Sequence, residues 1–180
     1  TDVHKYSPMA VTCDFNPQDP NEIYLGDNID MANCLKSEIE KAQKEHDDLK
    51  SVYQERMVTG NHSRTLPIGE YYIVNGEFGR VFCTHGDREA NEEYWKAYRS
   101  KPKGAGFLKR TFWVPALEIF EDIYDRSIHT EIFDRMASVA KSNNCTAYIC
   151  GHFHPKEVID VMHNDVRILV LPRGRTELDL

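Results

Sequence analysis

Four short apolar runs in this chain each lead directly into a polar segment that carries Asp, Asn or His. The runs cover residues 23–25, 57–58, 81–83 and 147–150. A short apolar run bounded by Gly or polar residues is typical of a buried β-strand. Because helical stretches separate the runs, the chain is predicted to be an α/β protein. Its polar segments are then expected at the carboxyl ends of the strands, the edge at which open α/β sheets carry their sites.

The polar segments contain the side chains that a two-metal centre for phosphoester cleavage requires. Five segments contribute, in this order: Asp2-Val3-His4, Gly26-Asp27-Asn28-Ile29-Asp30, Gly60-Asn61-His62, Thr84-His85-Gly86-Asp87 and Gly151-His152-Phe153-His154. Oxygen from Asp and Asn together with imidazole nitrogen suits Mn, Fe, Zn or Ni ions. An aspartate can bridge two such ions where a water becomes the nucleophile. The pattern therefore predicts a hydrolase.

At these segments the chain resembles the calcineurin-like metallophosphoesterases, whose pattern is D-x-H, G-D-x-x-D, G-N-H-D/E, H-G and G-H-x-H. The resemblance implies two divalent ions that share Asp27 as a bridge, with Mn as the leading candidate for the metal. It also implies that a hydroxide bridging the two ions attacks phosphorus. It implies that one ion is held by Asp2, His4, Asp27 and His154, and the other by Asp27, Asn61, His85 and His152. It implies further that His62 contacts the phosphate and protonates the leaving oxygen, and that Asn28 lies at the substrate.

The third segment departs from the family, because Ser63 stands where an acidic residue usually follows the Asn-His pair. A carboxylate at that place could orient the histidine, as outer-shell partners of functional groups commonly do. Asp30 and Asp87 are the candidates to replace it, and the sequence leaves open which of them lies within reach of His62.

The resemblance implies a two-sheet sandwich flanked by helices, formed by one domain over residues 1–180 with a helical cap inserted between the fourth and fifth segments at about 88–130. An apolar stripe from Leu35 to Tyr53 at helical spacing predicts a crossover helix between two parallel strands. Hairpins are predicted at 71–84, turning at Asn75-Gly76, and at 158–171. A stripe from Ile132 to Ala140 predicts a core helix. The family would place a whole strand before Asp2, so we expect residues upstream of Thr1.

The expected cap combines basic and aromatic side chains. Positions 96–110 contain six Lys or Arg and no acid, although the whole chain has a formal charge of −7. Large apolar residues border this run, so Lys103, Lys109 and Arg110 could grip an anionic head group while the apolar residues meet an acyl chain or a membrane surface. This layout is similar to the UDP-2,3-diacylglucosamine pyrophosphohydrolases, although the segment 171–175 does not match their usual ending. A solvated surface loop is the other reading of the run.

Composition limits the remaining classes of function. The chain of 180 residues is 41% hydrophobic and 28% charged, which is ordinary for a globular domain. It lacks an apolar run of the ~20 residues that span a bilayer, and its five cysteines show no paired spacing, so we expect a cytoplasmic protein with Cys83 and Cys150 buried. The acidic total charge argues against broad nucleic-acid affinity. Three alternatives stay open: peripheral membrane contact through the cap, contact of its basic and aromatic residues with a single-stranded nucleic acid, and a non-catalytic interaction scaffold on the same fold.

Overall fold

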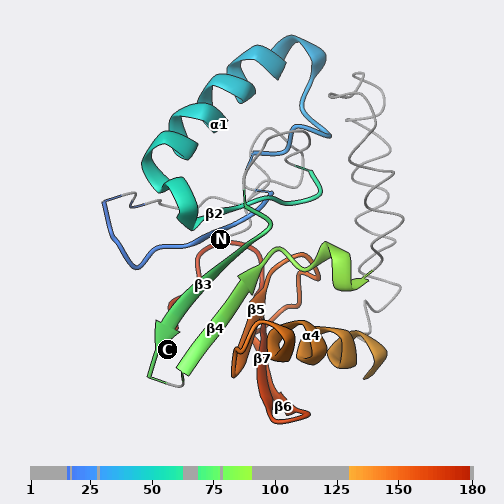
Figure 1. The fold of residues 1–180 in the computed structure, drawn as a ribbon. Coiled ribbons are helices and arrows are strands. Elements are labelled where there is room, and N and C mark those ends of the chain that lie inside the picture. The colour runs from blue at the N-terminus through green and yellow to red at the C-terminus, as the bar shows by residue number, and fades with distance from the viewer. Residues whose placement is uncertain are drawn as a thin grey trace.

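The protein is described by a computed structural model for residue 16 and residues 18–27, 29–62, 69–77, 79–90 and 130–178. These residues form a mixed α/β structure with a two-stranded sheet, β1-β2, and a five-stranded sheet in the order β3-β4-β5-β7-β6 (Figure 1). The strands are β1 (Tyr24–Leu25), β2 (Met57–Val58), β3 (Tyr71–Gly76), β4 (Gly79–Thr84), β5 (Ala147–Cys150), β6 (Ile159–His163) and β7 (Val166–Val170). The described helices include α1 (Ile39–Tyr53), α4 (Thr130–Ser142) and two 3-10 turns at Lys36–Glu38 and Gln54–Arg56.

The two-stranded sheet and α1 form a parallel βαβ unit. β1 pairs with β2 in parallel, with Tyr24 opposite Met57, and α1 is the crossover between them. Its buried face carries Ala42, His46 and Tyr53, and the Tyr53 ring packs 5.1 Å from that of Tyr24. The crossover helix predicted from the apolar stripe is therefore confirmed, because spacing of three and four residues brings one face of a helix onto the strands.

The five-stranded sheet has a parallel centre with an antiparallel hairpin at each edge. β4 pairs with β5 and β5 with β7, all in parallel, so the carboxyl ends of these three strands meet at the same edge. β3 joins β4 and β6 joins β7 as antiparallel neighbours. Every strand predicted in front of a polar segment is found, and each polar segment begins where its strand ends.

Both predicted hairpins form, but the first turns later than expected. Gly76 pairs with Gly79, so Asn75-Gly76 ends strand β3 and the chain reverses two residues beyond the predicted turn. Cross-strand pairing of buried residues sets the register of a hairpin, and Gly79, with φ +99°, supplies the left-handed backbone there. In the second hairpin the turn is Asn164-Asp165, and both residues have positive φ (49° and 59°), as a tight primed turn requires.

The large sheet is covered on both faces. On one face Phe82, Tyr148 and Ile168 pack with Met136 and Ala140 of α4, which lies across β5 and β7 (Figure 1). On the other face the alternate residues of the same strands pack against β1 and β2. They are Val81, Cys83, Ala147, Ile149 and Leu169, which contact Leu25 and Val58. The alternation follows from the two-residue period of a strand, and it holds β1 and β2 close to the edge where β4 and β5 end.

The core helix and the cysteines also follow the prediction. The predicted core helix is α4, which includes the stripe from Ile132 to Ala140. The helix ends before Asn143-Asn144, where Asn144 adopts φ 55°. Cys83 and Cys150 are buried in their strands, as expected. Among the described helices, none has the length and apolar character that a bilayer crossing requires.

Candidate metal centre

Four loops that follow β1, β2, β4 and β5 bring Asp27, Asn61, His85 and His152 together. The two sheets are linked at this point by a hydrogen bond of 2.9 Å between His85 Nδ1 and the carbonyl oxygen of Leu25, the last residue of β1. Paired parallel strands end side by side. The loop after β2 therefore lies beside the loop after β1, and the loop after β5 lies beside the loop after β4. The strand ends therefore converge on one place.

His85 lies at the centre of the cluster. Its Nε2 lies 2.9 Å from Asp27 Oδ2, 2.8 Å from Asn61 Oδ1 and 3.2 Å from His152 Nδ1. Asp27 and His85 are fully buried and Asn61 is 1% exposed, whereas His152 is partly exposed. The cluster thus has a buried floor and one face toward solvent.

The hydrogen bond to Leu25 determines which nitrogen of His85 faces the cluster. A backbone carbonyl only accepts, so His85 Nδ1 carries a proton, and in the neutral ring Nε2 then presents a lone pair. That lone pair faces the oxygens of Asp27 and Asn61, which are electron donors as well. With Asn61 Oδ1 turned toward His85, a cation among these atoms makes the arrangement favourable, either as a proton on His85 or as a metal ion.

The donor set fits a divalent ion. Ligands at about 2.1 Å from an ion and at right angles to one another are about 3 Å apart, close to the separations of 2.8 to 3.2 Å around His85 Nε2. A metal-binding histidine commonly donates its other ring N–H to a backbone carbonyl, as His85 does to Leu25. Within the described ranges, however, no group of three or more His, Cys, Asp or Glu side chains is already arranged to hold a metal ion. His85 Nε2 contacts the other three atoms directly.

The backbone around the cluster is strained. Asp27, His152 and His154 have φ of 40°, 52° and 47°, a left-handed conformation that costs a non-glycine residue about 1–3 kcal/mol. Gly60 lies so close to Asp27 that a Cβ at position 60 would be 2.6 Å from the Asp27 backbone nitrogen. Such strain gathers at sites where side chains are aimed at a ligand.

Asp30 is within reach of His62. Asp30 Oδ1 lies 3.0 Å from His62 Nδ1, and the Asp30 side chain is fully buried while that of His62 is 13% exposed. Asn33 holds the carboxylate from the other side, since its backbone nitrogen and its Nδ2 donate to Asp30 at 2.8 and 3.0 Å. The backbone nitrogen of His62 also donates to Asp27 Oδ1 at 2.6 Å. His62 is therefore fixed both to the cluster and to a buried carboxylate.

His154, the other histidine after β5, makes a different described contact. Its Nδ1 accepts a hydrogen bond of 3.1 Å from Nε of Arg173, which follows β7. An imidazole whose Nδ1 accepts in this way carries its proton on Nε2 when neutral. His154 must therefore give up this bond, or change its proton arrangement, before it can serve as a metal ligand.

Buried acidic groups continue behind the cluster along residues 87–90. Asp87 is 2% and Glu89 7% exposed. Burial raises the pKa of the Glu89 carboxyl, and the Tyr148 hydroxyl acts in the opposite direction. Burial and the charge of Glu89 also raise the pKa of Tyr148 well above its usual value. Asp87 belongs to the fourth polar segment, but no motif marks Glu89. No motif marks the contacts of Asn33 with Asp30 or of Arg173 with His154 either.

Several predicted site residues lie outside the described residues. They are Asp2 and His4 of the first ligand set, Asn28, Ser63, and the basic residues Lys103, Lys109 and Arg110. Most of the expected cap also falls in the undescribed range 91–129.

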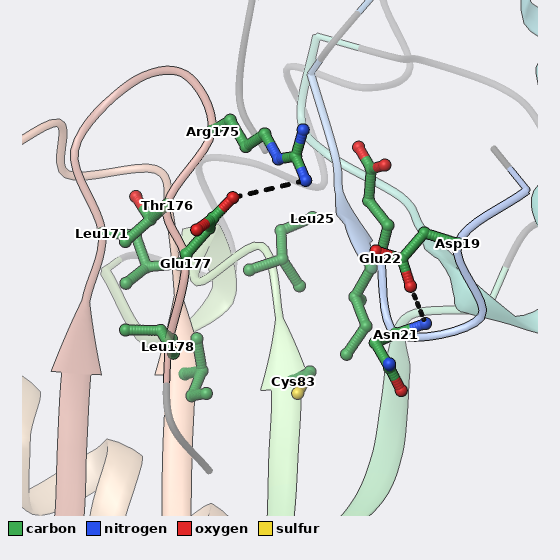
Figure 2. Close-up of a pocket in the computed structure, with 12 residues that line it drawn as sticks. Asp19, Asn21, Glu22, Leu25, Cys83, Leu171, Arg175, Thr176, Glu177 and Leu178 are labelled. Carbon is green, nitrogen blue, oxygen red and sulfur yellow. Dashed lines mark hydrogen bonds and ion pairs between the residues drawn. The ribbon is translucent and has the colours of Figure 1, made fainter. Parts of the chain in front are cut away.

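A cavity of about 220 Å³ is lined in part by Leu25, the residue whose carbonyl oxygen contacts His85 (Figure 2). Its apolar lining includes Leu25, Cys83 and Leu171, and burial raises the pKa of the Cys83 thiol to about 12. At its rim Arg175 pairs with Glu177 at 3.5 Å (Figure 2). Arg175 therefore belongs to the cavity rim, two residues after the arginine that contacts His154.

No family model matches the chain, and a search of the curated proteins finds no match either. The assignment of the site therefore depends on the residues and contacts described above.

Proposed function

We propose that this chain is a metal-dependent phosphohydrolase of the calcineurin-like kind. The observation that carries the proposal is the contact of Asp27, Asn61 and His152 with a single nitrogen of His85, from four loops that the sequence marks with ligand motifs. With His85 neutral, a cluster of two acceptor oxygens and two imidazoles at a buried strand edge is electrostatically unfavourable. A divalent ion at this place removes that cost.

The arrangement of the two sheets supports the finer fold proposal. The five-stranded sheet packs β1 and β2 on one face and α4 on the other, as expected for a two-sheet sandwich flanked by helices. The ligand segments then lie where strands of both sheets end, so one centre can draw ligands from each.

Asp27, Asn61, His85 and His152 would hold one ion, and Asp2, His4, Asp27 and His154 a second. The chemistry that such ions supply is Lewis acidity toward a phosphate and a lowered pKa of water, which together permit attack on phosphorus. Asn and Asp oxygens with imidazole nitrogens suit Mn and its neighbours in the first transition row.

His62 performs the proton transfer in this proposal. In the protonated form that can donate to a leaving oxygen, His62 carries N–H on both ring nitrogens. Its Nδ1–H then donates to Asp30 at 3.0 Å, with Asn33 Nδ2 at 3.2 Å, and Nε2–H is left to meet the leaving oxygen. Because Asp30 is buried and His62 partly exposed, the ring is held from the protein side and faces solvent and substrate with its other edge. Asp30 thus takes the role of the acid that is missing at Ser63.

The test is metal content together with hydrolysis of bis-p-nitrophenyl phosphate in the presence of Mn. We expect Asp27→Asn and His152→Ala to lower kcat/KM by more than about a hundredfold and to lower the bound metal. His163→Ala is the matched control, because His163, the last residue of β6, pairs with Asp134 of α4 and not with the cluster. A wild-type protein that retains metal but cleaves no phosphoester would favour the non-catalytic scaffold, and one that retains no metal would contradict the site itself.

The lipid-linked substrate remains a separate hypothesis, carried by the composition of the segment 94–115. Replacing Lys103, Lys109 and Arg110 by Ala is expected to weaken hydrolysis of a nucleotide-linked lipid and to spare bis-p-nitrophenyl phosphate. Equal loss on both substrates would remove the reason for assigning this segment to lipid recognition.

A further inference from the structure

Arg173 stands beside the proposed site because of the order of the strands. β7 runs parallel to β5, with Val170 opposite Cys150, and Leu171 continues the ladder by donating to the Cys150 carbonyl at 2.8 Å. The segments that follow β5 and β7 therefore leave the sheet side by side and in the same direction. This brings Arg173 next to His154, with 3.1 Å between Nε and Nδ1.

The contact with His154 joins a permanent cation to a neutral acceptor. Arg remains charged at every ordinary pH, and its five N–H donors form a planar fork that matches the oxygens of a phosphate. Arg173 already brings an ionised donor to His154, but a phosphate adds an ionised acceptor and two oxygens for a bidentate pair, whereas His154 Nδ1 accepts a single N–H. A phosphate oxyanion is therefore a better partner for Arg173 than an imidazole nitrogen, and a bound phosphate can take the guanidinium from His154.

The charges around the site make a cation necessary there. Asp27, Asp30 and Asp87 are buried, with exposures of 0%, 0% and 2%. An anionic substrate that approaches these carboxylates is repelled unless positive charge lies beside it. Metal ions would supply part of that positive charge. Arg173 adds a fixed positive charge next to His154, in the loop that follows β5.

We propose that Arg173 is a specificity-determining residue that makes the site prefer a terminal phosphate over a phosphodiester. This inference rests on the phosphohydrolase function proposed above. A monoester phosphate carries a charge near −2 at neutral pH and three non-bridging oxygens, whereas a diester carries a single charge and two such oxygens. A fixed guanidinium therefore gains more from the monoester, both in charge and in oxygens that its fork can reach.

The test compares p-nitrophenyl phosphate with bis-p-nitrophenyl phosphate under the same Mn concentration. For Arg173→Ala we expect kcat/KM on the monoester to fall at least about tenfold more than on the diester, mainly through KM, since a charged hydrogen bond contributes about that much. Arg173→Lys keeps the charge without the fork, so we expect an intermediate loss. If the alanine variant does not fold, the comparison of the two esters is made with Arg173→Lys instead. Equal losses on the two esters, or no loss on either, would overturn the inference.

Arg175→Ala is the matched control. Arg175 has a side chain exposed to 37% and pairs with Glu177 at the rim of the neighbouring cavity (Figure 2), so both kinetic constants are expected within twofold of wild type. Titration calorimetry with inorganic phosphate, with and without Mn, supplies a readout that needs no turnover. A wild type that cleaves neither ester contradicts the proposed function. In that case weaker phosphate binding by Arg173→Ala still supports the role of Arg173, and unchanged binding refutes it.

Discussion

Gly60→Ala is expected to disable the proposed metal centre without unfolding the protein. Position 60 follows β2, and a Cβ built there meets the Asp27 side chain, with Oδ1 and Cγ as its nearest atoms and the Asp27 backbone nitrogen at 2.6 Å. Asp27 is the residue that the proposal assigns to both ions, and it already has an unfavourable φ of 40°. The added methyl group therefore acts directly on the shared ligand.

The magnitude follows from the contact distances. Carbon and oxygen atoms that are not bonded prefer about 3.5 Å, so the Asp27 carboxylate must move by roughly 1 Å to make room. A misplacement of about 1 Å in a catalytic site can cost about a hundredfold in rate. Insertion of a methyl group into a packed region typically costs about 1–3 kcal/mol, which corresponds to a lowering of Tm by about 2–4 °C for each kcal/mol in a chain of this size.

The assay is kcat/KM on bis-p-nitrophenyl phosphate, bound Mn by elemental analysis, and Tm by circular dichroism. Gly79→Ala is the control, because it places a Cβ 2.7 Å from Thr146 Oγ1 at φ +99°, at the end of β4 that lies away from His85. We expect both variants to lose stability and Gly60→Ala alone to lose metal and activity. Wild-type metal content and rate in Gly60→Ala would refute the reasoning.

Three further predictions concern buried groups. Asp30→Asn is expected to lower kcat by about 10- to 100-fold while bound Mn stays constant, since Asp30 positions His62; loss of metal would assign Asp30 to the ion instead. Burial raises the pKa of Cys83 to about 12, so at pH 8 about one thiol in ten thousand is ionised in the folded protein. Alkylation of Cys83, followed by mass spectrometry, should therefore be about a thousandfold slower in the folded protein than in the protein unfolded in urea. A similar rate in both would contradict the burial of Cys83. Burial also raises the pKa of Glu89 from 4.5, so the native state binds its proton more tightly than the unfolded state and stability falls as pH rises above about 4.5. The stability gained by Glu89→Gln, from urea unfolding, should therefore grow from pH 4 to pH 8, and a constant difference would refute this.

The strands and the crossover helix could be predicted from the sequence because their signals are local. The apolar runs at β1, β2, β4 and β5 are short and end at polar residues, and the stripe in α1 repeats at helical spacing. The first hairpin was placed correctly but its turn was not, because Asn75-Gly76 is a strong turn signal that the register of β3 with β4 overrides. Only the paired strands reveal that register.

The sequence allows the residues of the candidate site to be predicted, but not the hydrogen bonds that connect and orient them. Motifs placed Asp27, Asn61, His85 and His152 at strand ends, and strand order then brings them together. The partners that orient the network have no motif of their own. Asp30 was one of two candidates for His62, and nothing in the sequence joins Arg173 to His154, because that contact depends on β7 lying beside β5.

A crystal structure of the Mn-loaded protein, with anomalous scattering recorded at the manganese edge, tests the proposed metal centre. We expect an anomalous peak within about 2.0–2.3 Å of Asp27, Asn61, His85 and His152, with His85 Nδ1 still bonded to the Leu25 carbonyl. A protein that remains folded at millimolar Mn and shows no peak among these four side chains would contradict this proposal.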